Sequence, residues 1–278
     1  MGLPLATAIQ VIRVCETLSE KKSVCVLGVQ KINFSVRDII KLEKTLQSKI
    51  DLNFLNHLKI DEKLDQDLFF KSIGFKKVYS LDNSDYEGAE IIYDLNKPIN
   101  EKTIKNRFDF IYDGGTLEHI FNIGEAIKSL SKLLNKNGII FHCNPTNGFI
   151  DHGFFQISPN FFRDFYLKNN FEILSCLIYD RAFGHRYYNL NRDIYRDIDS
   201  EFGRIKAPKS LICFSARRLS DNKNLLIPQQ DFYIKKWNNQ ADKEFDVRYR
   251  FILQKKLSMK IKIFLKKLIH NIFINVFS

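Results

Sequence analysis

Residues 108–119 read Phe-Asp-Phe-Ile-Tyr-Asp-Gly-Gly-Thr-Leu-Glu-His, a mostly apolar strand with an abrupt polar end. The apolar run stops at Asp113, and Gly114 and Gly115 follow it directly, before a helical pattern begins. In an open α/β sheet, ligands bind at the carboxyl ends of the strands, where such residues gather. The segment therefore predicts a site at a strand end.

Strand and helix patterns alternate on both sides of this segment. Further apolar strands are expected over residues 23–27, 77–81, 89–93, 139–143, 171–179 and 211–216. Helical spacing of apolar residues predicts helices over residues 5–18, 35–47, 124–134 and 159–169. The strand at 139–143 is expected to be interrupted at Asn144-Pro145. This alternation predicts βαβ units and a mostly parallel sheet.

Composition excludes several classes of protein. No uninterrupted apolar run approaches the roughly 20 residues that cross a bilayer, and the first residues lack the pattern of a cleaved signal. The five cysteines are scattered, with no Cys-x-x-Cys pair, which favours buried, reduced thiols over disulfides or a metal site. A cytoplasmic protein without a metal site is therefore expected.

The chain carries a formal net charge of +11, and about half of the excess lies at its end, because residues 255–278 hold six lysines and no acid. Leu257, Ile261, Phe264 and Leu268 repeat at helical spacing between the lysines, which predicts a basic amphipathic helix. Such a helix suits either an anionic membrane surface, giving peripheral attachment at the inner membrane face, or packing on the protein or a dimer partner. No RNA-binding motif accompanies the charge, so nucleic acid is not expected as a partner.

Four segments together resemble a known family. They are residues 80–89 (Ser-Leu-Asp-Asn-Ser-Asp-Tyr-Glu-Gly-Ala), 93–96 (Tyr-Asp-Leu-Asn), 113–119 (Asp-Gly-Gly-Thr-Leu-Glu-His) and 152–159 (His-Gly-Phe-Phe-Gln-Ile-Ser-Pro). In this order they resemble class I, Rossmann-like S-adenosylmethionine-dependent methyltransferases, near the methyltransferase-like proteins associated with bacterial surface-polysaccharide synthesis. The resemblance implies a Rossmann-like three-layer α/β sandwich with a mostly parallel seven-stranded sheet, plus helical appendages.

The predicted elements and the resemblance together divide the chain into four parts. We expect an N-terminal helix over residues 1–20, the methyltransferase-like domain over 21–219, a linker and appended segment over 220–254, and the basic amphipathic helix over 255–278.

S-adenosylmethionine is the cofactor that the resemblance implies. The first strand ends in Gly28-Val29-Gln30-Lys31, with one glycine where the family carries a glycine-rich turn. Either Val29 and Gln30 crowd the methionine portion, or Gln30 hydrogen-bonds it. Asp82, at the end of the next strand, is placed to accept hydrogen bonds from both ribose hydroxyls, with an ordinary turn or cap aspartate as the alternative.

Further cofactor contacts are implied beyond the first two strands. Asp94 would lie near the adenine amino group or simply form a turn. Asp113 would stabilise the sulfonium or the methionine amine by charge, or cap the turn to the next helix. Gly114 and Gly115 would allow close backbone approach, whereas Glu118 fits a first helical turn, where an acid complements the macrodipole.

His119 and His152 are the candidate general bases, since imidazole titrates near neutrality, and a structural role is the alternative for each. Methyl transfer depends mainly on alignment of donor and acceptor, so activity does not require a base. The implied function is O- or N-methylation of a small molecule or glycan precursor. The alternative is a catalytically degenerate methyltransferase fold that serves as a binding or scaffold protein of a glycan-assembly complex.

Overall fold

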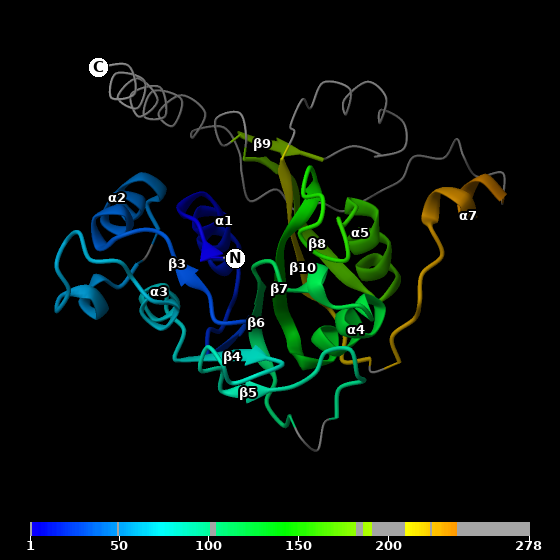
Figure 1. The fold of residues 1–278 in the computed structure, drawn as a ribbon, viewed down its shortest axis with the longest axis horizontal. Coiled ribbons are helices and arrows are strands. Elements are labelled where there is room, and N and C mark those ends of the chain that lie inside the picture. Colours follow the sequence, from blue (N-terminus) through cyan, green and yellow to red (C-terminus); the bar gives the residue numbers. More distant parts are fainter. Residues whose placement is uncertain are drawn as a thin grey trace.

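The main feature of the computed structural model is an eight-stranded sheet with the order β5-β4-β2-β6-β7-β10-β8-β9 (Figure 1). The structure describes residues 2–237 apart from 49, 101–103, 182–185, 191–208 and 223. In spatial order the strands are β5 (Ile91–Ile92), β4 (Lys77–Asp82), β2 (Ser23–Leu27), β6 (Phe108–Asp113), β7 (Leu134–Asn147), β10 (Ser210–Arg218), β8 (Phe171–Asp180) and β9 (Arg186–Asn189).

Strand direction divides this sheet into two parts. Neighbours from β5 to β7 are parallel, whereas β10 runs antiparallel to both β7 and β8, and β9 runs antiparallel to β8. The predicted mostly parallel sheet of seven strands is therefore confirmed. The short strand β9 is an addition that the sequence did not predict.

Helices cover both faces of the sheet, as Figure 1 shows. One face carries α1 (Leu5–Cys15), α2 (Val36–Leu46) and α3 (Gln66–Ser72), and the other carries α4 (Ile123–Leu133) and α5 (Pro159–Lys168). The remaining elements are short: β1 (Gly2–Leu3), β3 (Lys31–Ile32), the 3-10 turns η1 (Leu52–Leu55) and η2 (Leu117–His119), and α7 (Asp231–Trp237). The structure is thus the three-layer sandwich that the sequence predicted.

Two apolar cores lie between these layers. Val24 and Val26 of β2 face the core that includes α1, α2 and α3, whereas Cys25 and Leu27 face the core that includes α4 and α5. Successive side chains of a strand point to opposite faces, so a central strand covered on both sides is apolar at every position. The helix predicted over residues 5–18 packs through Val11 into the first of these cores.

Strand β7 corrects one expectation. The strand was predicted to be interrupted at Asn144-Pro145, but it continues to Asn147, and Pro145 pairs with Leu211 of β10. Pairing with β6 ends at His142, so the proline nitrogen interrupts no hydrogen bond on that side. This extension carries Asn144 into the centre of the site described below.

Several other expectations concern the chain outside the sheet. All five cysteines are free and buried, as predicted. Beyond β10, the Asp231 N–H at the start of α7 donates to Asp164 Oδ2 of α5 at 3.2 Å. Among the described residues, no helix has the length and apolar character to cross a membrane. The basic helix expected at 255–278 lies outside the described residues.

Candidate functional site

The carboxyl ends of β2, β4 and β6 meet around Gly28, where the strand order reverses direction. Gly28 has φ 69°, and its N–H donates to the Leu81 carbonyl at 2.8 Å. A Cβ atom at this position would lie 3.6 Å from Asp82 Oδ2 and 3.7 Å from Thr116 Oγ1. Ligands of open α/β sheets bind in the crevice at such a switch point. The backbone at Gly28 therefore lies between the ends of the two neighbouring strands.

Gln30 occupies the turn that follows Gly28. Its Nε2 donates to the Leu27 carbonyl at 2.8 Å, and its buried Oε1 has no hydrogen-bond partner among the described residues. A Cβ atom at Gly114 would lie 2.9 Å from this Oε1. The Gln30 side chain therefore fills the space between the ends of β2 and β6, and its oxygen is able to accept a hydrogen bond from a ligand amine.

Asp82 and Asp94 end their strands in different ways. Asp82 Oδ1 accepts a hydrogen bond from the Asn83 N–H at 2.6 Å, while Oδ2 faces Gly28. Asp94 Oδ1 accepts hydrogen bonds from the N–H and the side-chain amide of Asn96, both at 3.0 Å. These hydrogen bonds lower the pKa of Asp94. Asp94 is thus a turn residue in this structure, and its contact with adenine stays a prediction.

Asp113 is completely buried and uses both carboxylate oxygens within the chain. Oδ1 accepts from the N–H groups of Thr116 and Leu117, at 2.9 and 3.3 Å. Oδ2 accepts from Asn144 Nδ2 at 2.9 Å and lies 2.8 Å from His142 Nδ1. Burial alone would raise its pKa, but the hydrogen bond and charge of His142, with the other donors, hold the pKa below the ordinary value. Asp113 therefore caps the turn, and its predicted contact with the sulfonium remains a prediction.

His142 is a buried partner that the sequence analysis did not single out. Its Nε2 lies 2.7 Å from the Tyr166 hydroxyl, and its ring stacks on Phe162 with centroids 4.2 Å apart. With Asp113 ionised, Nδ1 donates to the carboxylate, and Nε2 is left for the hydrogen bond with the Tyr166 hydroxyl. The strand pattern at 139–143 gives no sign of this role, because a buried histidine within an apolar run has the same spacing as any core residue.

Both glycines of the turn meet a geometric demand. Gly115 has φ 99°, a backbone conformation that other residues rarely adopt. At Gly114 a Cβ atom would lie 2.6 Å from Cε1 of the buried Tyr112 ring. At Gly114 the backbone thus lies close to the side chains of Tyr112 and Gln30. Its predicted close approach to the cofactor stays a prediction.

Glu118 lies in the first turn of the short 3-10 helix η2, in agreement with its interpretation from the sequence. Its carboxylate is, in addition, completely buried, which the sequence did not indicate. Oε2 accepts from Asn144 Nδ2 at 3.0 Å, so Asn144 bridges Glu118 and Asp113. Burial, and then the negative charge of Asp113, raises the pKa of Glu118 to about 7. A carboxyl group with such a pKa is able to exchange protons near neutrality.

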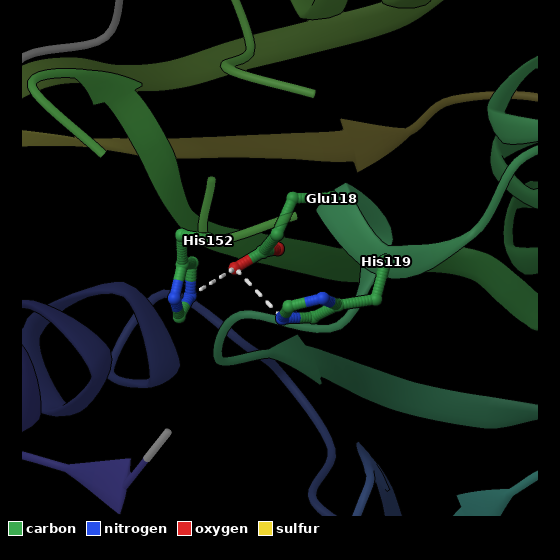
Figure 2. Close-up of side chains that lie close together, drawn as sticks. All are labelled: Glu118, His119 and His152. Atoms are coloured by element: carbon green, nitrogen blue, oxygen red, sulfur yellow. Dashed lines mark ion pairs between the residues drawn. The ribbon is translucent and has the colours of Figure 1, made fainter. Parts of the chain in front are cut away.

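His119 and His152 come together beside Glu118, although 32 residues separate them in the sequence (Figure 2). Their ring centroids are 5.0 Å apart, at an interplanar angle of 65°. Burial, and then the neighbouring His152, lowers the pKa of His119. The neutral form of His119 is therefore favoured at pH 7, which is the form that accepts a proton or binds a metal.

Two exposed aromatic residues follow the two histidines in the chain, each two positions further on. Phe121 and Phe154 are 73% and 65% exposed and meet edge to face, with centroids 5.6 Å apart. Large exposed apolar side chains that cluster beside polar groups are typical of a binding surface. This edge therefore offers an acceptor an apolar surface next to titratable side chains.

A cavity of about 510 Å³ lies elsewhere, between α4, α5 and the segment around Pro228. None of the predicted site residues lines it.

The strand order, numbered along the seven principal strands, is 3-2-1-4-5-7-6, with the last strand in sequence antiparallel to its neighbours. This is the Rossmann-like fold of class I methyltransferases.

Comparisons with solved structures return several proteins at low sequence identity. TehB from Haemophilus influenzae is 16% identical over 54% of this chain and 52% of its own, with a TM-score of 0.33. A SAM-dependent methyltransferase from Archaeoglobus fulgidus is 11% identical over 76% and 92%, with a TM-score of 0.38. An S-adenosylmethionine-dependent methyltransferase from Clostridium acetobutylicum is 10% identical over 78% and 91%, with a TM-score of 0.32. The chain thus spans about half the length of TehB.

No protein-family model and no curated protein matches the sequence.

Proposed function

We propose that this chain is an S-adenosylmethionine-dependent methyltransferase that acts on a small molecule or a glycan precursor. The observation that carries the proposal is the position of Asp82 Oδ2, which faces Gly28 at the switch point of the sheet. A carboxylate in this position is able to accept hydrogen bonds from the two ribose hydroxyls. Because Gly28 has no side chain, it leaves room for the nucleoside.

The methionine portion would extend toward Gln30 and Gly114. There the unpartnered Gln30 Oε1 would accept a hydrogen bond from the methionine amine. The transferred methyl group would then point toward the edge formed by His119 and His152. Alignment of the acceptor with the carbon–sulfur bond supplies much of the rate acceleration in such a reaction.

Replacement of Asp82 by asparagine is expected to weaken binding of S-adenosylhomocysteine by roughly 10- to 100-fold, because hydrogen bonds to a charged acceptor are replaced by weaker ones. Calorimetry on the full chain measures the change. The control is Asp85→Asn, which removes the same charge from an exposed loop residue and should bind as the unmodified protein does. No detectable heat from the unmodified protein at millimolar ligand would refute the methyltransferase.

A carbohydrate acceptor agrees with the exposed aromatic pair Phe121 and Phe154, because aromatic rings are able to pack against the apolar face of a sugar while their surroundings hydrogen-bond its hydroxyls. We extend the proposal to a glycan precursor on this basis.

One observation favours the second candidate, a degenerate fold that serves as a binding or scaffold protein. The Gln30 side chain fills the turn and donates a hydrogen bond to the Leu27 carbonyl. The space that the methionine portion would need is therefore closed unless the Gln30 amide moves. Gln30→Gly separates the candidates: in a protein blocked by this side chain, the variant gains S-adenosylhomocysteine binding. In a working methyltransferase, the variant loses the contact to the methionine amine and binds more weakly.

The proposal includes attachment to an anionic membrane through residues 255–278, with attraction of about 1 kcal/mol per lysine near the lipid. The full chain is expected to float with anionic liposomes, whereas a chain that ends at Gln254 remains at the bottom of the gradient. Equal flotation of the full and the shortened chain would contradict membrane attachment through residues 255–278. It would favour packing of this segment on the protein or on a second copy.

A further inference from the structure

Glu118, His119 and His152 form a compact cluster of potential metal ligands. His119 Nε2 lies 3.9 Å and His152 Nε2 lies 3.8 Å from the same oxygen, Glu118 Oε1 (Figure 2). One ligand atom from each of the three residues falls within 4.8 Å of the other two. Figure 2 shows both imidazoles directed at this carboxylate from different segments. Two neutral imidazoles and one carboxylate are a common ligand set for divalent transition metals.

The oxygen at the centre of the cluster has no hydrogen-bond donor among the described residues. Glu118 Oε1 is completely buried, whereas the other oxygen accepts from Asn144. A buried carboxylate oxygen without a partner is costly, and a bound cation would remove that cost. Asn144 would then act as the outer partner that orients a ligating carboxylate.

The backbone around residue 153 holds the two segments together. The Phe155 N–H donates to the Glu118 carbonyl at 3.2 Å. A Cβ atom at Gly153 would lie 2.9 Å from that carbonyl oxygen and 3.2 Å from His119 Nδ1, so this approach requires a glycine. Since His152 directly precedes Gly153, this close approach holds the backbone of His152 beside Glu118.

We propose that Glu118 Oε1, His119 Nε2 and His152 Nε2 bind one divalent transition-metal ion. Zinc bonds of about 2.0–2.1 Å place tetrahedral ligands about 3.3 Å apart, so on binding each histidine nitrogen would move about 0.5 Å closer to Glu118 Oε1 than the present 3.9 and 3.8 Å. The side chains of His119 and His152 are 46% and 34% exposed, which gives an ion access from solvent. Three protein ligands leave a coordination position open.

The open position would bind the oxygen of the methyl acceptor, and this step rests on the proposed function. A coordinated hydroxyl has a lowered pKa and releases its proton to water. Its oxygen then forms a bond with the methyl carbon while the bond from that carbon to sulfur breaks, and sulfur keeps the electron pair. In this arrangement the two histidines are ligands of the metal and not the bases that the sequence suggested.

Zinc binding by the full chain, prepared without a histidine tag, tests the proposal. Competition with a chromogenic chelator is expected to show one zinc ion per chain. His152→Ala should weaken binding at least roughly 100-fold, more than the loss of an outer partner costs. His57→Ala removes an exposed histidine that is distant in sequence from Glu118, His119 and His152, so it should leave the zinc affinity unchanged. The five cysteines do not compete, because all are buried.

Glu118→Gln provides a second measurement, because it keeps the shape of the side chain and removes only the charge. Its zinc affinity should fall by a similar factor, and cobalt bound to the unmodified protein should show visible absorption bands that both variants lose. Absence of stoichiometric binding, or equal affinities in Glu118→Gln and His57→Ala, would overturn the site. Zinc binding is measured without methyl donor and S-adenosylhomocysteine binding without metal, so either hypothesis is able to fail alone.

Discussion

Replacement of Asp113 by alanine is expected to lower the free energy of unfolding by about 3–5 kcal/mol at pH 7. The carboxylate is completely buried, contacts His142 and Asn144, and caps the turn at Thr116. Alanine would leave these buried donors without a hydrogen-bond acceptor. The free energy lost in this way is larger than the net stabilisation that the original hydrogen bonds provide. Urea denaturation measures the change, and Asp85→Ala, at an exposed position, should alter it by less than about 0.5 kcal/mol.

The contribution of Asp113 also has a defined pH dependence. Its pKa in the folded protein is lower than the ordinary value of 3.8, so folding favours the ionised form. The stabilisation is therefore complete above about pH 4 and is lost as the pH falls through the lower, folded pKa. The difference in unfolding free energy between the unmodified protein and Asp113→Asn should therefore shrink as the pH falls from 4 toward 2, a range in which Glu118, with its pKa of about 7, stays protonated. A difference that grows over this range would show that the carboxylate is not stabilised as an ion.

Gly114→Ala is expected to destabilise the protein by about 3 kcal/mol, at the upper end of the effect of overpacking. The added Cβ would lie 2.6 Å from the Tyr112 ring. That ring cannot swing away, because it is buried and packs on Phe70 and Phe141. Thermal unfolding measures the effect.

Gly124→Ala is the matched control for this substitution. It adds the same methyl group within α4, where a Cβ atom meets nothing within 4 Å. Because alanine favours a helix, this control should be about 0.5–1 kcal/mol more stable than the unmodified protein. Equal changes in the two variants would mean that the space around Gly114 is not limiting.

Much of the fold could be predicted because its elements have strong local patterns. A central strand such as β2 is apolar at every position, and α5 begins at Ser158-Pro159, where the Ser158 hydroxyl accepts from the Asn160 N–H. The short strand β9 lies in a polar, tyrosine-rich segment without such a pattern. Pairing with β8, and not its own sequence, makes it a strand.

The site could be predicted only in part, because its contacts join distant segments. The end of β6 was identifiable from an acid and two glycines, but its buried partner His142 lies 29 residues further on. Likewise, nothing near Glu118 in the sequence indicates that His152 and Asn144 enclose its carboxylate. The sequence therefore identified the two histidines separately and gave no reason to join them through Glu118.

Strand β9 also bears on how molecules of this protein meet one another. An uncovered sheet edge exposes a row of free N–H and carbonyl groups that another chain is able to extend. In this sheet, β9 pairs with Leu177–Asp180 of the ten-residue strand β8 and takes the outermost position (Figure 1). Along Leu177–Asp180 the outermost strand is therefore only four residues long, a length that disfavours aggregation through strand pairing at this part of the edge.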